Sequence, residues 1–495
     1  MATTVQPETA ADTFEAGADP KRFRALAVIA IAQLMIVLDA SVVTIALPKA
    51  QEALHISNAN RQWALTAYTL AFGGLLLIGG RIADYLGRKR VFIFSLLGFA
   101  AASALGGLSQ DAAMLFSARA LQGAFASLMA PASLSLLTVT FTQPKERARA
   151  FGVYGAIAGG GAAIGLIIGG LLTEYASWRW TLGINVPIAI FAALAATREV
   201  RESRAGGART YDAPGAVMVT GGLLCLVYGF TRAQSDGWGA PITLCLLAAA
   251  VVLLVGFVLR ERSTPGPLLP LRVVLDRNRG GSFLASLLVG VGLFGMFLFL
   301  TYYMQGILHY SALKTGFAFL PFSGGIIFSA TMASQLLTRF GPRVLMPIGL
   351  AMAAAGMAWF TQIGVHTAYV SHVLPAEIIM SVGLGFAFVP FSNLALIGVR
   401  PHDAGVASAL VNATQQVGGS MGTALLNTVA NSATNSFMAA RHHAARYLAQ
   451  GYVHGYTSGF VVGLVVLLVA TVLAVVLVNA SRDQVPNQSM GVVPA

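Results

Sequence analysis

The sequence predicts an all-α polytopic membrane protein with fourteen transmembrane helices, and three observations point to this fold class. Of the 495 residues, 56% are hydrophobic and only 10% are charged, whereas a soluble domain carries about 25% charged residues. The apolar residues form long runs, near the roughly 20 residues that cross a bilayer. Lys and Arg gather in short clusters between these runs, as is typical of membrane proteins. A soluble enzyme or a nucleic-acid-binding protein is therefore not expected, despite the net charge of +12.

The apolar runs place the predicted spans at 25–47, 63–82, 91–109, 112–137, 150–172, 181–197, 214–231, 241–259, 282–306, 314–337, 344–364, 372–397, 404–430 and 457–479. The first run is too long for a cleavable signal peptide and contains Asp39, so we expect it to be retained. The polar, acidic segment Met1–Pro20 is expected to be disordered. Lys and Arg fall mainly in alternate loops, which predicts a plasma-membrane protein with both termini in the cytoplasm.

Two loops indicate an internal repeat. In the loop after the second span, Gly80 is followed seven positions later by Gly87, and in the loop after the tenth span Ser334 is followed seven positions later by Gly341. This spacing predicts two related six-helix halves. The expected organisation is a cytoplasmic tail at 1–22, a first half at 23–200, an inserted two-helix hairpin with its flanking loops at 201–280, a second half at 281–480 and a cytoplasmic tail at 481–495. Parallel halves of this kind place the substrate site between them near the bilayer midplane.

Several motifs together resemble those of a known family. They are Leu38–Pro48, Gly80–Arg90, Arg119–Gly123, Trp178–Pro187 and Tyr302–Pro321. At these residues the chain resembles the major facilitator superfamily, in its fourteen-spanner drug:proton antiporter branch, and the resemblance covers essentially the whole chain. It implies the major facilitator fold and a transporter, not an enzyme. The implied activity is proton-coupled export of small lipophilic drugs, antibiotics or secondary metabolites by alternating access.

The fifth span departs from the antiporter motif at one position. Gly161, Gly165, Gly169 and Gly170 keep the glycines of the motif, but Leu166 stands where the resemblance implies a proline. The glycines are expected to let this span pack closely against a neighbouring helix. Ordinary packing of small residues explains them equally well.

Proton coupling requires a group that titrates within the membrane. The eight histidines fall in loops or at span ends, which leaves the carboxylates as candidates. Asp39 precedes Pro48 by nine residues, about 13 Å of helix, and so lies near the midplane. A carboxylate at this depth is costly and marks function. Glu377 lies only about five residues into its span and is expected to be close to the hydrated surface.

Arg119 in the fourth span lies at a depth comparable to that of Asp39. Asp39 and Arg119 are therefore the predicted proton-coupling residues. The alternative is a permanent ion pair between them that only fixes helix packing.

The loop after the second span supplies the candidate gating residues. These are Gly80, Asp84, Gly87 and Arg88, with Asp403 at the start of the thirteenth span as the expected partner. A carboxylate such as Asp84 can interact with the partial positive charge of a helix N-terminus. The alternative is a basic loop that sets only the membrane topology.

Aromatic, methionine and amide side chains suit bulky lipophilic ligands. The candidate substrate-binding residues are Gln33, Met35, Tyr68, Gln122, Met129, Met296, Tyr302, Gln305, Asn393, Asn412 and Gln416. The expected partners are this substrate, protons and the lipid bilayer, without nucleic acid, and the protein is expected to be a monomer. The chain shows no nucleotide-binding or metal-binding motif, so we expect no cofactor and no metal, with the proton gradient as the driving force.

Other interpretations remain open from the sequence. An uptake symporter for a nutrient, peptide or siderophore, a lipid exporter, or a membrane sensor would share much of this pattern. Segment 431–456 is expected to be an outer loop, either solvated or a pH-sensitive lid, because it holds several Arg and His residues. Cys225 and Cys245 lie in apolar runs and are expected to act as small packing residues.

Overall fold

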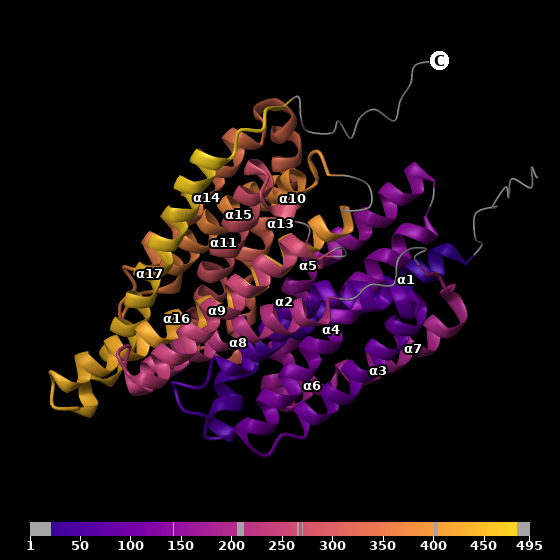
Figure 1. The fold of residues 1–495 in the computed structure, drawn as a ribbon. Helices are drawn as coiled ribbons and strands as arrows, with labels where there is room; N and C mark the ends of the chain where they lie inside the picture. Colours follow the sequence, from indigo (N-terminus) through magenta and orange to yellow (C-terminus); the bar gives the residue numbers. More distant parts are fainter. Residues whose placement is uncertain are drawn as a thin grey trace, which may run out of the picture.

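A computed structural model describes residues 21–141, 143–204, 212–264, 267–269, 271–399 and 404–482. Throughout these ranges the regular structure is helical, with no strand. The all-helical class predicted from the sequence is therefore confirmed. Figure 1 shows long helices running side by side along most of the chain.

The helices, in chain order, are α1 (Arg22–Ala53), α2 (Trp63–Leu86), α3 (Arg88–Gly107), α4 (Ala112–Thr140), α5 (Pro144–Tyr175), α6 (Trp180–Gly183), α7 (Asn185–Glu199), α8 (Ala213–Asp236), α9 (Pro241–Ser263), α10 (Leu271–Val274), α11 (Arg277–Tyr302), α12 (Ala312–Ala318), α13 (Leu320–Phe340), α14 (Pro342–Phe360), α15 (Leu374–Leu396), α16 (Ala404–Ala439) and α17 (Leu448–Leu477). Short π-helical turns, η1 (Tyr303–Ile307) and η2 (Tyr369–Val373), continue α11 and precede α15, and a 3-10 turn, η3 (Ala445–Tyr447), precedes α17.

Within the described ranges, eleven helical segments are long and apolar enough to cross a membrane, or twelve if the two parts of α2, bent by 56°, form one span. α5 and α16 each contain a predicted span but are not among the twelve. In α5 the apolar stretch among the described residues is Gly161–Tyr175, which is shorter than a span, and in α16 many Ser, Thr, Asn and Gln residues lower the hydropathy. The multi-span architecture is confirmed, while the number fourteen stays a prediction.

The prediction of a long loop at 431–456 is wrong. α16 continues to Ala439 and α17 begins at Leu448, so residues 440–447 alone join them. Arg441 lies in this short connection, where its guanidinium stacks 3.5 Å from the centroid of the Phe437 ring at the end of α16. Apolar residues identify the part of a helix that lies inside the bilayer, whereas the helix itself can continue beyond the bilayer surface.

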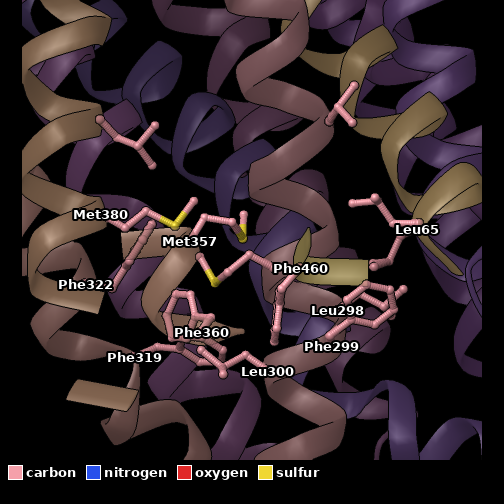
Figure 2. Close-up of a cluster of buried hydrophobic side chains, with 14 of the residues drawn as sticks. Leu65, Leu298, Phe299, Leu300, Phe319, Phe322, Met357, Phe360, Met380 and Phe460 are labelled. Carbon is pink, nitrogen blue, oxygen red and sulfur yellow. The ribbon is translucent and has the colours of Figure 1, made fainter. Parts of the chain in front are cut away.

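The helices of the second half pack around an aromatic core (Figure 2). Phe299 of α11, Phe360 of α14 and Phe460 of α17 are almost completely buried, and their ring centroids lie 5.5–5.8 Å apart in successive pairs. A separate apolar cluster joins α1, α3, α4 and α7 in the first half. The cluster around the phenylalanines also includes residues of α1 and α2, such as Ala46 and Leu65, so it extends across the junction between the two sets of helices.

The α8–α9 pair lies beside the junction of the two sets of helices. Leu223 and Val227 of α8 share one apolar cluster with Leu70 of α2 and Ala424 of α16. The Thr220 hydroxyl donates to the Gly74 carbonyl oxygen of α2 at 3.1 Å. α8 therefore contacts a helix from each half.

The two loops that suggested the repeat have similar backbone geometry. Gly87 joins α2 to α3 with φ of 110°, and Gly341 joins α13 to α14 with φ of 74°. Both values lie in the region that favours glycine. The sharp turn between consecutive helices therefore explains why both loops need this residue.

The bundle has two ends. α1 begins and α17 ends on the same side in Figure 1, and we name this side the terminal end. The connection 440–447 lies on the opposite side, which we name the loop end.

Close backbone contact between α11 and α16 yields a test of the packing. A Cβ at Gly418 would overlap the carbonyl oxygen of Leu287, whereas a Cβ at Gly324, on the exposed face of α13, meets nothing within 4 Å. We expect Gly418→Ala to lower the free energy of unfolding by about 1–3 kcal/mol because the two helices must move apart. Thermal unfolding of the detergent-purified protein measures this. The matched Gly324→Ala variant should unfold like the parent or later, and an equal loss in both variants would contradict the close contact.

Candidate functional site: a buried ion pair in the first half

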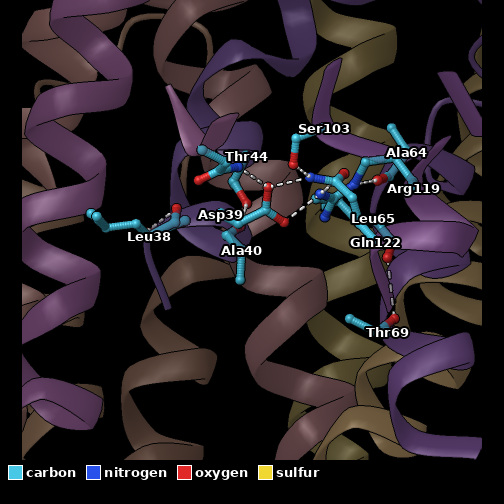
Figure 3. Close-up of polar contacts among 12 residues, drawn as sticks. Leu38, Asp39, Ala40, Thr44, Ala64, Leu65, Thr69, Ser103, Arg119 and Gln122 are labelled. Atoms are coloured by element: carbon cyan, nitrogen blue, oxygen red, sulfur yellow. Dashed lines mark hydrogen bonds and ion pairs between the residues drawn. The ribbon is translucent and has the colours of Figure 1, made fainter. Parts of the chain in front are cut away.

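Asp39 lies in the middle of α1 and is fully buried. Its Oδ2 atom pairs with Nη1 of Arg119 on α4 at 2.5 Å. Its Oδ1 atom accepts hydrogen bonds from the side-chain amides of Gln122 and Asn185, each at 2.8 Å. Figure 3 shows the carboxylate facing Arg119 and Gln122. Helices α1, α4 and α7 thus converge on one carboxylate.

The guanidinium of Arg119 is held by further contacts within the first half. Its Nε donates to the Ala64 carbonyl oxygen of α2 at 2.9 Å, and its Nη1 also donates to Oε1 of Gln122 at 2.8 Å. Its Cζ lies 4.4 Å from the centroid of the Tyr68 ring. Arg119 and Gln122 stand three residues apart on α4 and therefore share one helix face.

This arrangement makes the charge state of Asp39 consequential. Burying two charges costs several kcal/mol per ion before their attraction is counted, so the pair depends on close geometry and on the amide donors. A proton on Asp39 would remove the negative charge and leave the Arg119 guanidinium facing neutral groups. Two hypotheses were made from the sequence: a proton-coupling pair, and an ion pair that only fixes helix packing. Both require this contact.

Sequence reasoning missed two members of this network. Asn185 begins α7 and donates directly to Asp39, and the Ser103 hydroxyl on α3 accepts from the Gln122 amide at 2.7 Å. Asn185 lies within the Trp178–Pro187 motif, but the motif alone gave it no role. Asn185 could have been found as an isolated amide at the start of an apolar span, because a polar side chain at that position requires a partner.

The candidate gating residues form a local arrangement at the terminal end. Arg88 Nε donates to Oδ1 of Asp84 at 2.8 Å across the turn at Gly87. Gly80 packs against the Pro131 ring, and a Cβ added at Gly80 would lie 3.5 Å from the proline Cβ. Asp403, the expected partner, lies outside the described residues.

Glu202, which was not singled out from the sequence, lies beside this turn. Its carboxylate accepts hydrogen bonds from the backbone N–H groups of Lys89 and Arg90 at 3.1 and 3.2 Å. It therefore caps the N-terminus of α3, where negative charge is favourable.

The four glycines of α5 lie at close helix contacts. Gly161, Gly165 and Gly169 face α1, and a Cβ at Gly169 would lie 2.9 Å from the Val42 Cα. Gly170 faces the other half instead, where its Cβ would lie 2.6 Å from the Leu313 Cα of α12. The same helix therefore contacts both halves through small residues.

The candidate substrate-binding residues fall into different environments. Five are enclosed in helix packing in this conformation, namely Met35, Tyr68, Gln122, Met129 and Met296. Tyr302 and Gln305 line a cavity of about 950 Å³ at the loop end, together with residues of α1, α5 and α12. Gln33 is buried, Asn393 and Gln416 are half-buried, and Asn412 is exposed. The structure does not bring the eleven together at one surface.

The expectation that Glu377 is hydrated is wrong. Its side chain is fully buried, and Oε2 accepts a hydrogen bond from the Tyr369 hydroxyl at 3.1 Å. The π-helical turn η2 places Tyr369 over the first turn of α15 and covers the carboxyl group. Depth along a helix does not by itself predict exposure, because a neighbouring turn can cover the site.

In the ranges that the structure describes, no three His, Cys, Asp or Glu side chains are grouped so as to hold a metal ion. Cys225 is half-buried and Cys245 is exposed, and both are free thiols.

A bundle of apolar helices with a charged pair sealed inside one half is the architecture of a polytopic membrane transporter. The family model described as Major Facilitator Superfamily matches residues 29–423. The chain is 53% identical over 417 residues to the puromycin resistance protein of Streptomyces alboniger, covering 84% of this chain and 83% of that protein. It is 38% identical over 409 residues to a cephamycin export protein of Amycolatopsis lactamdurans, covering 82% and 84%.

The fold agrees with these relatives. A crystal structure of a bacterial homologue of the human lysosomal transporter Spinster, inward-facing and unoccupied, matches with a TM-score of 0.68 at 15% identity, covering 95% of this chain and 99% of that chain. The chain belongs to the Major Facilitator Superfamily, as the sequence motifs indicated. It is a transporter and not an enzyme.

The buried ion pair predicts an asymmetric response to substitution. Arg119→Met leaves the Asp39 carboxylate buried without its cation and should lower the free energy of unfolding by about 3–5 kcal/mol. Combining it with Asp39→Asn should recover much of this loss, because no unpaired charge then remains. Chemical unfolding of the purified variants measures both.

The matched control is Arg90→Met, which removes a largely exposed ion pair with Glu202 at 3.7 Å. It should cost no more than about 1 kcal/mol. Additive losses from Arg119→Met and Asp39→Asn would show that the two side chains do not interact.

Proposed function

We propose that the protein is a proton-coupled antiporter that exports antibiotics or other small lipophilic molecules across the plasma membrane. Relatives that are 53% and 38% identical carry names of antibiotic resistance and export. The observation that carries the coupling mechanism is the fully buried Asp39–Arg119 pair. The named relatives do not favour the uptake alternative.

The proposed topology has fourteen spans, formed by α1–α5, α6 with α7, α8, α9, α11, α12 with α13, and α14–α17. Lys and Arg favour a cytoplasmic location for both termini, so the terminal end is assigned to the cytoplasm and the loop end to the outside. The two halves are residues 23–200 and 281–480, with 201–280 as the inserted hairpin. The protein acts as a monomer and is driven by the proton gradient without a cofactor.

In the proposed cycle, proton movement is coupled to transport because the Asp39 carboxylate either carries a proton or pairs with Arg119. When the site opens outward, Asp39 takes a proton from the outside and its ion pair with Arg119 is lost. The neutral carboxyl and the released guanidinium rearrange the contacts between α1, α4 and α7, which expels the substrate and permits the inward turn. When the site opens inward, substrate binding favours release of the proton to the cytoplasm and the ion pair forms again.

The loop-end contacts support an inward-facing assignment for this conformation. Gln305 of η1 donates to the Ile45 carbonyl oxygen of α1 at 3.0 Å, and the Leu313 N–H of α12 donates to the Glu174 carboxylate of α5 at 3.0 Å. Both contacts join the halves on the proposed outer side. Asp84 then acts as a gate on the cytoplasmic side, contacting the start of α16 when that side closes.

The substrate is proposed to bind between the halves, where candidates from both sequence halves would converge during the cycle. Puromycin is the probe of choice because the resistance protein for it is 53% identical. Expression in a puromycin-sensitive bacterium should raise the inhibitory concentration several-fold and lower the accumulation of labelled puromycin. Increased accumulation would contradict export.

Asp39→Asn should abolish transport driven by a pH gradient while the protein still folds and inserts, because asparagine cannot carry the proton. Labelled puromycin uptake into proteoliposomes with an imposed gradient measures this. Asp111→Asn is the matched control, since Asp111 caps α4 with an exposed side chain outside the ion-pair network. Gradient-driven transport by Asp39→Asn at the parent's rate would refute the coupling role.

A further inference from the structure

Arg61, immediately before α2, is a buried cation that the coupling mechanism does not use. Its side chain is 2% exposed, and among the described residues it forms no ion pair. Its Nε donates to Oδ1 of Asn427 at 3.1 Å. Its Cζ lies 4.0 Å from the Tyr302 ring centroid and 5.9 Å from the Tyr456 ring centroid. The guanidinium is therefore held by two aromatic faces and an amide oxygen.

All three partners of Arg61 come from the other half. Tyr302 belongs to α11, Asn427 to α16 and Tyr456 to α17. A guanidinium removed from water without a counter-ion is costly, and aromatic faces lower this cost through cation–π attraction. Because the compensating groups lie across the junction, the buried position of Arg61 is stable only while the two halves meet at the loop end.

The same junction continues along α2 and α16 as a ladder of hydrogen bonds. Oε1 of Gln62 accepts from the Asn427 amide at 2.7 Å. One helical turn further from the loop end, the hydroxyls of Thr66 and Thr423 lie 2.7 Å apart.

A third rung joins the hydroxyls of Thr69 and Ser420 at 2.6 Å. Residues 62, 66 and 69 share one face of α2, and the order of their partners on α16 is reversed, as antiparallel helices require. The Arg61 contact lies at the loop end of this ladder.

The connection before α2 is fixed to the other half as well. The Asn427 and Asn431 amides both donate to the Asn58 carbonyl oxygen at 3.0 Å. Gln51 of α1 donates to Oδ1 of Asn58 at 2.8 Å and accepts from the Tyr302 hydroxyl. The backbone that carries Arg61 is therefore positioned to deliver its guanidinium between the two tyrosine rings.

We infer that Arg61 is a positioning residue that latches the loop end of the transporter shut, with Tyr302 and Tyr456 as the aromatic cage that receives it. This inference rests on the proposed alternating-access function, in which the loop end is the outer side. When the outer side opens, the guanidinium leaves the cage for water and the ladder below it separates. Loss of the latch therefore shifts the population toward the outward-open state.

Accessibility of a buried outer position tests the latch without drug or pH gradient. The parent is an Ala46→Cys protein in which Cys225 and Cys245 are replaced by alanine. Ala46 of α1 is 2% exposed and packs in the apolar cluster shared with α11. Its labelling by a membrane-impermeant maleimide in intact cells should rise about tenfold in Arg61→Gln, since a cation–π contact and a hydrogen bond are lost. Arg61→Lys, which keeps the cation, should restore slow labelling at least in part.

Two further variants examine the cage from the other half. Tyr302→Leu removes the ring and should accelerate labelling like Arg61→Gln, whereas Tyr302→Phe keeps the ring, loses only the hydroxyl's hydrogen bond to Gln51, and should label more slowly than Tyr302→Leu. Should Arg61→Gln fail to insert, Tyr302→Leu tests the same contact. Equal labelling of the parent and Tyr302→Leu would then overturn the latch.

Arg179→Gln is the matched control. Arg179 also lies near the loop end, with its Cζ 4.5 Å from the Trp178 ring centroid and its Nη2 donating to the Ser109 carbonyl oxygen at 2.7 Å. Both partners belong to the same half as Arg179, so labelling should match the parent. Unchanged labelling in a well-folded Arg61→Gln, or an equal rise in Arg179→Gln, would overturn the inference. Either result would leave the Asp39 coupling proposal standing, because the assay involves neither substrate nor proton flux.

Discussion

The ion pair between Asp39 and Arg119 is the constraint on which the first half depends. It places opposite charges on α1 and α4 in an otherwise apolar core, where α2 and α7 supply hydrogen bonds to the charged groups and α3 holds the Gln122 amide that contacts both. Removing either charge leaves a group that the surrounding helices cannot solvate. The relative positions of these helices therefore depend on the charge of one carboxylate, and the proton coupling that we propose rests on this dependence.

Composition and the long apolar runs were sufficient for the all-helical, multi-span fold class, while the number of spans stays a prediction. Long apolar runs predicted the helical class, and the spacing of Gly80 and Gly87 against Ser334 and Gly341 identified two loops that turn through positive φ at the same position. Helix ends were less predictable, because α16 extends through polar residues to Ala439 and α17 begins already at Leu448. Apolar content reports the membrane environment, whereas helix length depends also on local packing and capping.

The site was predictable only in part. The depths of Asp39 and Arg119 followed from their distance to the span ends, and the structure places them in contact. Asn185 could not be assigned, since nothing in one sequence tells which helices meet at a given depth. Glu377 shows the same limit, because the turn that covers it is formed by Tyr369 and not by the residues of its own helix. Contacts between distant segments are a property of the fold and not of local pattern.

The position of α8 has a consequence for how the halves move. Thr220 of α8 donates to the α2 backbone, and Thr428 of α16 donates to the Phe230 carbonyl oxygen of α8 at 3.0 Å. In a rigid-body rotation, atoms near the axis are displaced least. A rotation axis close to α8 would preserve both hydrogen bonds, whereas a distant axis would break at least one of them. In the alternating-access cycle that we propose, the contacts of α8 with both α2 and α16 would therefore favour a rotation axis close to this helix.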